Sequence, residues 1–189
     1  LGSSEIGKEE VQDPPQVELG PLVDLYTKGK LEEAMAAVKR MLVKYPRSTA
    51  VYNIKGAVEM VLKDYEQAIK SYQKALDFKY KCPSTLNNFA TALKENGNIL
   101  DAITHYKKAL KLKTDYAIAY NNLGNALYDL GKFNDAILEY KKAIKYDKLY
   151  EDAYFNLGNV FQNLGSFEKA VDCFKNILSL NYKNISAIE

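Results

Sequence analysis

The sequence predicts an all-α protein, a solenoid in which about five copies of one helix hairpin stack on each other. Three observations lead to this fold class. Residues 117–150 form two halves, each with apolar residues every three or four positions, as on one face of an α-helix. Gly131 separates the halves, where a helix end favours glycine because the left-handed conformation costs it nothing. The pattern then returns after 34 residues, so successive hairpins can share one core.

The small and aromatic residues of this unit resemble the tetratricopeptide repeat. The resemblance rests on a 34-residue period and on five positions: Tyr120, Gly124, Ala136, Tyr140 and Ala143. Small residues recur where helices approach closely, and bulky residues recur where they fill the remaining gap. The resemblance implies a right-handed superhelix of helix pairs, with the first helix of each pair lining a concave face.

The repeats follow one another along the chain without long linkers. We expect them at residues 15–48, 49–82, 83–116, 117–150 and 151–184, with the start of a further repeat at 185–189, so that the array covers residues 16–189. Residues 1–15 are polar and have too few apolar side chains to offset the entropy of ordering, so we expect a disordered leader or a cloning remnant. Gly20 and Pro21 interrupt the first helix, which we expect to begin near Pro21 because proline is best tolerated in an opening turn.

The second repeat departs from the pattern in its first helix and in the turn that follows it. Lys55 and Glu59 stand where the fourth repeat has Leu123 and Leu127, and Lys63 replaces the turn glycine. Lys55 and Glu59 are four residues apart and can pair on a helix surface. We expect this helix either to pack more loosely or to rotate, and favour the rotation. The inward face would then consist of apolar residues: Ile54, Val58 and Leu62.

The last helix lacks a polar outer side. Its apolar residues would lie partly in water: Phe167, Val171, Phe174 and Leu178. A solenoid end of this kind needs a cap or another molecule. We therefore expect either a longer native protein or association of copies through the C-terminal end.

Composition excludes several classes of function. The net charge of +2 combines 26 basic and 24 acidic residues, so we expect neither nucleic acid nor a membrane as partner. The one histidine, His105, has no nucleophile near it, and Cys82 and Cys173 lie at different places in their repeats, so we expect no metal, no cofactor and no catalytic site. The chain has neither a long apolar run nor a signal peptide at its start, and the expected location is the cytoplasm.

The concave face is predicted to be rich in carboxamides. Side chains of the first helices that do not pack inward form rows spaced by 34 residues, and asparagine dominates these rows. A carboxamide both donates and accepts hydrogen bonds, so it can hold the main chain of an extended peptide whatever its sequence. The candidate peptide-binding residues are Asn53, Asn87, Asn88, Asn121, Asn122, Asn125, Tyr128, Asn156 and Asn159.

One of these rows has a counterpart in a known group of enzymes. Asn88, Asn122 and Asn156 resemble the asparagine ladder in the repeat region of O-linked N-acetylglucosamine transferases, which holds protein substrates by their backbone; Ile54 stands outside it. The alternative is that these asparagines hydrogen-bond an adjacent helix. A co-chaperone clamp for a terminal carboxylate is rejected, because its cations are missing at the matching places: Ala50, Ser84, Ile118 and Asp152.

Three functions fit these features. The first is a protein-interaction scaffold that binds a peptide or protein segment in the concave groove. The second is a substrate-recruiting arm of a larger enzyme, because residues 21–46 resemble the start of arrays that precede glycosyltransferase-like or sulfotransferase-like domains. The third is assembly into a homo-oligomer through the open end, which is compatible with either.

Overall fold

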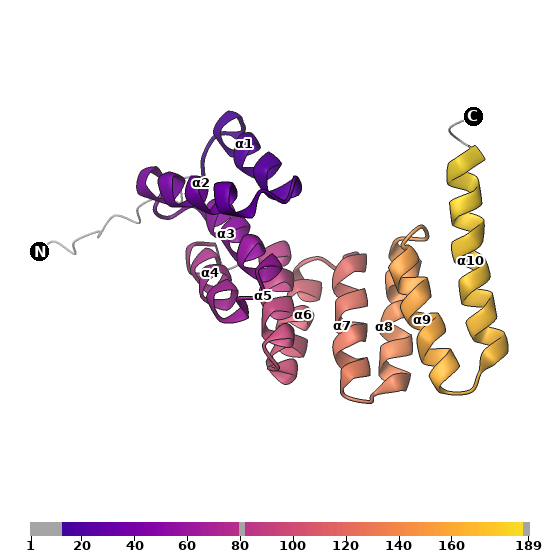
Figure 1. The fold of residues 1–189 in the computed structure, drawn as a ribbon. Helices are drawn as coiled ribbons and strands as arrows, with labels where there is room; N and C mark the ends of the chain where they lie inside the picture. The colour runs from indigo at the N-terminus through magenta and orange to yellow at the C-terminus, as the bar shows by residue number, and fades with distance from the viewer. Residues whose placement is uncertain (1–12, 80–81, 187–189) are drawn as a thin grey trace, which may run out of the picture. The chain divides into compact units, whose positions relative to one another are not determined.

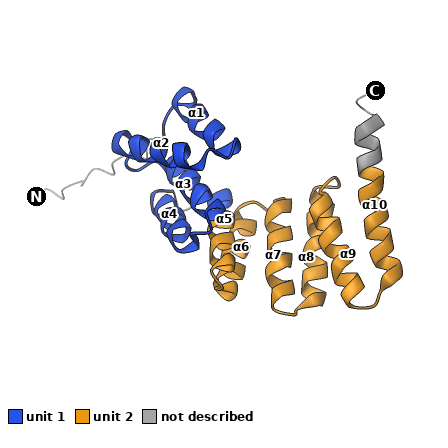
Figure 2. Ribbon diagram, viewed as in Figure 1, with its two compact units in different colours: residues 1–85 blue, residues 86–189 orange. Residues whose placement is uncertain are grey.

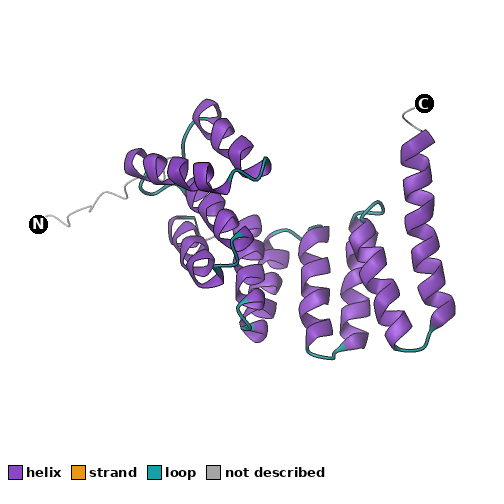
Figure 3. Ribbon diagram, in the orientation of Figure 1, coloured by secondary structure: helices purple, strands orange, loops and turns teal. Residues whose placement is uncertain are grey.

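A computed structural model describes residues 13–79 and 82–186, with side chains through residue 180. This part of the chain contains ten α-helices in consecutive pairs and no strand (Figures 1 and 3). Four of the first helices begin at the first residue of a predicted repeat. The helices are α1 (Gln16–Thr27), α2 (Leu31–Lys44), α3 (Thr49–Val61), α4 (Tyr65–Phe78), α5 (Pro83–Glu95), α6 (Ile99–Leu112), α7 (Ala117–Asp129), α8 (Phe133–Tyr146), α9 (Glu151–Asn163) and α10 (Phe167–Ser186).

The chain divides into two compact units, residues 1–85 and 86–189 (Figure 2). In the first unit α1 packs against α2 and α3, and α3 packs against α4. Its core contains fully buried apolar side chains from three helices: Leu22, Ala34, Val38, Val51 and Val58. In the second unit each helix from α6 to α9 packs against the next, and α7 also contacts α9. Each unit is therefore built by stacking neighbouring helices.

The two helices of a repeat meet at a contact between a glycine and an aromatic ring. A Cβ atom added to Gly124 would lie 2.6 Å from Cε1 of Tyr140, and one added to Gly158 would lie 2.7 Å from Cε1 of Phe174. Gly56 faces Tyr72 in the same way. The glycine therefore lets the ring lie directly on the backbone of the first helix, which explains the small and aromatic positions of the repeat.

The turns inside the hairpins use the left-handed conformation. Gly29, Gly97, Gly131 and Gly165 have φ between 69° and 88°. Lys63 takes the same place in the second repeat with φ of 60°, which is strained for a residue with a Cβ atom.

The predicted rotation of α3 is wrong. Gly56 still faces Tyr72, Leu62 is 54% exposed, and Glu59 points inward with 6% exposure. The Lys55 ammonium pairs with the Glu59 carboxylate at 2.5 Å and donates to the Ser71 hydroxyl at 2.8 Å. Ser71 donates to the second carboxylate oxygen of Glu59. Because all three groups bond one another, this pair can occupy the place of two leucines without rotating the helix.

The predicted start of α1 is also wrong. The helix begins at Gln16 and contains Pro21, with Pro15 as its N-cap residue. The residues before it are held to α3: the Asp13 carboxylate accepts hydrogen bonds from the Ser48 hydroxyl at 2.6 Å and the Ala50 amide at 2.9 Å. Of the predicted leader, residues 1–12 lie outside the described part of the chain.

The last helix is longer than its predecessors. Helices α2, α4, α6 and α8 have 14 residues, whereas α10 has 20 and continues through Ser186. Residues 185 and 186, where the sequence matches the start of a further repeat, thus belong to α10, and residues 187–189 lie outside the described part. As predicted, α10 leaves apolar side chains exposed: Phe167 by 66%, Val171 by 48% and Leu178 by 69%.

Two glycine substitutions are expected to have opposite effects on stability. Gly124→Ala places a methyl group against the buried Tyr140 ring and should destabilise the chain by about 1–3 kcal/mol. Gly20→Ala is the matched control, because no atom lies within 4 Å of its Cβ position inside α1, and it should stabilise by about 0.5–1 kcal/mol. Urea unfolding followed by circular dichroism measures both changes. Equal effects of the two substitutions would contradict the close contact.

The buried pair in α3 is expected to show strong coupling. Lys55→Leu leaves the Glu59 carboxylate buried without its cation and should cost about 3 kcal/mol. The triple variant Lys55→Leu, Glu59→Leu and Ser71→Ala restores the leucines of the fourth repeat and should unfold at a urea concentration near or above that of the unmodified chain. Additive losses in the triple variant would show that the network contributes net stability.

Candidate functional site

The first helices of the second unit are joined by an asparagine ladder. Asn122 on α7 donates through Nδ2 to Oδ1 of Asn87 on α5 at 3.1 Å. Asn156 on α9 donates in the same way to Asn121 on α7 at 3.0 Å. Asn87 and Asn121 are each only 4% exposed. Two of the predicted rows therefore bond each other between successive repeats, and their carboxamides serve partly to hold α5, α7 and α9 together.

A second ladder joins the same helices two turns further along. The Lys94 ammonium on α5 lies 3.1 Å from Oδ2 of Asp129 on α7 and 3.0 Å from Oε1 of Glu95. Tyr128 on α7 accepts a hydrogen bond from Asn163 on α9. Burial alone would lower the pKa of Lys94, but the two carboxylates raise it above its ordinary value. Lys94 is therefore charged and fixed in place at neutral pH.

A middle row of polar side chains lies between the two ladders and consists of Thr91, Asn125 and Asn159. Tyrosines of the second helices bond the first two of these residues. The Tyr106 hydroxyl lies 3.0 Å from the Thr91 hydroxyl, and the Tyr140 hydroxyl donates to Oδ1 of Asn125 at 2.7 Å. Burial raises the pKa of Tyr140 far above its ordinary value, with Asp129 and Tyr128 adding to the effect, so this hydroxyl stays protonated. Both tyrosine hydroxyls are therefore held in place by hydrogen bonds to the middle row.

Asn159 is the exception in the middle row. The residue 34 positions after Tyr140 is Phe174, which has no hydroxyl. Among the residues that the structure describes, Asn159 makes no hydrogen bond through its carboxamide. One aromatic substitution between repeats therefore leaves a complete donor and acceptor group unused at this point.

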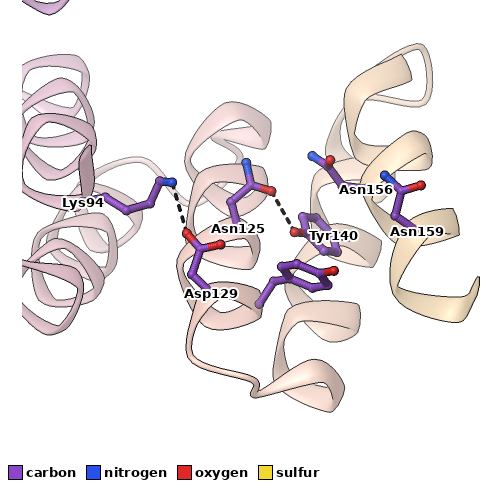
Figure 4. Close-up of a pocket in the computed structure, with 7 residues that line it drawn as sticks. Lys94, Asn125, Asp129, Tyr140, Asn156 and Asn159 are labelled. Atoms are coloured by element: carbon purple, nitrogen blue, oxygen red, sulfur yellow. Dashed lines mark hydrogen bonds and ion pairs between the residues drawn. The ribbon is translucent and has the colours of Figure 1, made fainter. Parts of the chain in front are cut away.

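These groups surround a cavity of about 240 Å³ (Figure 4). Figure 4 shows Asn156 and Asn159 on one side, the Lys94–Asp129 pair on the other, and Asn125 between them with its carboxamide bonded to Tyr140. The complete lining is Lys94, Asn125, Tyr128, Asp129, Tyr140, Asn156 and Asn159. Ionised and amide groups predominate, so the cavity suits a polar ligand.

The structure brings only part of the predicted site together. Asn125, Tyr128, Asn156 and Asn159 line the cavity. Asn87, Asn88, Asn121 and Asn122 belong to the ladder region, where Asn88 accepts a hydrogen bond from Asn87 at 3.3 Å. Asn53 lies in the first unit and donates to the Thr49 carbonyl and the Thr85 hydroxyl.

Three lining residues are not among the predicted peptide-binding residues: Lys94, Asp129 and Tyr140. Tyr140 reads as a core residue, and its ring is indeed buried, but its hydroxyl reaches the cavity. Lys94 and Asp129 are opposite charges 35 residues apart, the same offset that separates the bonded asparagines. That shared offset is the signal that could have found them.

Other kinds of site have no support in the described residues. These residues contain no group of histidine, cysteine and acidic side chains arranged to hold a metal ion. None of the described helices is both long enough and apolar enough to cross a membrane.

Three family models of the tetratricopeptide repeat match four stretches of the chain. A TPR repeat model matches residues 90–131 and 124–165, and two tetratricopeptide repeat models match residues 151–181 and 23–81. These stretches cover more than half of the sequence. The chain belongs to the tetratricopeptide-repeat family. The predicted fold class, an α-solenoid of tetratricopeptide hairpins, is thereby confirmed together with the paired helices of the structure.

Solved tetratricopeptide-repeat structures are similar over most of the chain. MamA is 26% identical with a TM-score of 0.73, covering 86% of this chain and 95% of its own. PilF of Pseudomonas aeruginosa is 16% identical with a TM-score of 0.79, covering 87% and 75%. YrrB, described as a TPR protein with an unusual peptide-binding site, is 20% identical with a TM-score of 0.64, covering 90% and 88%. A comparison with curated proteins gave no match.

The comparisons leave several predictions as they were. They do not test a connection to glycosyltransferase-like or sulfotransferase-like domains, the exclusion of nucleic acid and membranes as partners, or the cytoplasmic location. These stay predictions from the sequence.

Proposed function

We propose that the chain is a protein-interaction scaffold that binds an extended segment of a partner protein along α5, α7 and α9. The observation that carries the proposal is the set of unused carboxamide groups in the cavity. Asn159 has both its donor and its acceptor free, Asn125 keeps its Nδ2 donor, and Asn156 keeps its Oδ1 acceptor. The main chain of an extended peptide offers amide donors and carbonyl acceptors in alternation, which match these groups.

The ladders support this function because they hold the binding groups rigidly. Asn156 is tied to α7 through Asn121, and Tyr140 orients Asn125. Binding groups that are already ordered lose little conformational entropy when a ligand arrives, so more of the hydrogen-bond energy remains as affinity.

The size of the cavity favours a segment of polypeptide over an enclosed small molecule. Its 240 Å³ fall below the roughly 300–1,000 Å³ of typical ligand pockets, and its lining is polar. Phe155 precedes Asn156 on α9 and is 53% exposed, so an apolar side chain of the bound segment has a surface to contact beside the cavity. We therefore expect modest affinity, with the main chain held by carboxamides and selectivity set by neighbouring side chains.

The probe for this function is a set of peptides selected from a random display library for binding to this chain. The variant Asn125→Ala, Asn156→Ala and Asn159→Ala should lose roughly tenfold or more in affinity, since each net hydrogen bond contributes about 0.5–1.5 kcal/mol. Fluorescence anisotropy measures the binding. N-methylation of the central peptide amides should weaken binding as well, because the main chain is what the site recognises.

The matched control is Asn96→Ala with Asn134→Ala, since both side chains are exposed and neither lines the cavity. It should bind the selected peptides as tightly as the unmodified chain. Selected peptides that bind the triple cavity variant with unchanged affinity would place the binding surface elsewhere and refute the proposal.

A reciprocal pair of aromatic substitutions tests the role of Asn159. Phe174→Tyr supplies the hydroxyl that the fourth repeat has at Tyr140, so it should bond Asn159 and lower peptide affinity by roughly threefold to tenfold. Tyr140→Phe releases Oδ1 of Asn125 but also removes the hydrogen bond that orients this side chain, so it should lower affinity by less than Phe174→Tyr does. Isothermal titration calorimetry with one selected peptide compares the two. An unchanged affinity in Phe174→Tyr would mean that the Asn159 carboxamide does not contact the ligand.

A further inference from the structure

The exposed side of α10 carries an apolar stripe with the spacing of a coiled-coil seam. Phe167, Val171, Phe174 and Leu178 follow one another at intervals of four, three and four residues. Phe167, Val171 and Leu178 are 48–69% exposed. Phe174 is partly buried because its ring packs against Gly158, and the adjacent Ala170 and Cys173 are buried. Two helices pack along such a stripe when apolar residues alternate at these intervals. The stripe therefore has the pattern of a helix that packs against another helix.

The preceding repeat shows that a helix can cover this stripe. The equivalent residues of α8 are Phe133, Ile137 and Ile144, and all three are partly buried in a unit where α9 packs against α8. The stripe of α10 is thus a standard packing surface of the repeat that lacks its neighbour in the described part of the chain.

The first helix of another copy is a poor cover. In α1 the places of Leu157 and Val160 of α9 are taken by Pro21 and Asp24, both of which are exposed. Asp24 also forms an exposed ion pair with Lys28 at 4.0 Å. Packing α1 of one copy on α10 of another would bury these charged groups against apolar side chains at a cost in free energy. This argues against end-to-end growth of the solenoid.

The charges beside the stripe match those of a second α10. Glu168 and Lys175 are exposed, lie seven residues apart on the same flank of the stripe, and form no ion pair among the described residues. When two identical helices pack antiparallel about a two-fold axis, positions on the same flank face each other in reverse order. An axis between Val171 and Asp172 then brings Glu168 of each copy to Lys175 of the other, so both flanking contacts join opposite charges.

We propose that α10 is a homodimerisation surface, in which two copies of this chain pack their α10 helices antiparallel across Phe167, Val171 and Leu178. A parallel pair is disfavoured because its flanking contacts would need charges at the places of Ala170 and Ile177, which are apolar and turned toward the repeat. A shallow hollow on the stripe, lined by Phe167, Glu168, Val171, Asp172 and Lys175, accepts the partner's side chains. The surface shares no residue with the asparagine cavity, so this dimer does not depend on peptide binding.

Sedimentation velocity over a range of concentrations tests the dimer directly. The unmodified chain should approach the mass of a dimer as concentration rises, and Val171→Glu should remain a monomer with the same helicity and thermal midpoint. A strict monomer at every concentration would overturn the proposal. Growth beyond a dimer would also overturn it, because an open-ended series indicates a heterologous contact between the two ends.

A charge exchange tests the antiparallel arrangement. Glu168→Lys and Lys175→Glu should each weaken self-association by roughly tenfold, because both flanking contacts change from attraction to repulsion. An equal mixture of these two variants should dimerise as tightly as the unmodified chain, since every flanking contact in the mixed pair again joins opposite charges. Glu32→Lys on α2 makes the same charge change elsewhere and should have no effect. Failure of the mixture to dimerise would rule out the antiparallel pairing.

Discussion

The contact between a glycine of the first helix and an aromatic ring of the second sets the geometry of each repeat. Because Gly124 has no side chain, the Tyr140 ring lies directly against the backbone of α7. The hydroxyl of the same side chain donates to Asn125, the residue that follows Gly124 on α7. One residue thus serves as core and as a wall of the cavity. A larger residue at Gly124 would push the ring away and alter the position of that hydroxyl as well as the stability of the pair.

The regular features of this chain could be predicted from sequence because they depend on local spacing. Helix ends follow from turn glycines, and the buried glycine and aromatic positions follow from the 34-residue period. The orientation of Lys55 and Glu59 could not be predicted in this way. It depends on Ser71, a residue 16 positions away whose hydroxyl completes the network, and nothing in the local pattern of α3 indicates that partner. The start of α1 was predicted wrongly for a similar reason. Packing of α1 against α2 and α3 compensates for the backbone hydrogen bond that Pro21 cannot make inside the helix.

The candidate site could be predicted only in outline. Spacing identified the rows of asparagines but not which rows bond each other, because that depends on how successive hairpins pack. The offset between bonded partners is 35 residues, one more than the repeat period. It also decides which atoms remain available: Asn87 and Asn121 become structural, whereas Asn159 stays open because Phe174 cannot bond it. The regular positions of the repeat therefore determine the fold, whereas departures from the repeat determine which polar groups remain available for binding.

The asparagine cavity is polar, whereas the α10 stripe is apolar, so the two surfaces can be occupied by different partners at the same time. In the proposed function the cavity binds a peptide through hydrogen bonds of modest individual strength, so one site alone would bind weakly. The proposed antiparallel α10 dimer would contain two such cavities. A partner with two suitable segments then binds the second site at a high effective concentration, and the overall affinity rises without any new contact in either cavity. Because a two-fold pair fixes the distance between its sites, the length of chain between the two segments of the partner would determine whether both are engaged. Selectivity would then depend on the spacing of segments as well as on their sequence, which suits a site that contacts mainly the main chain.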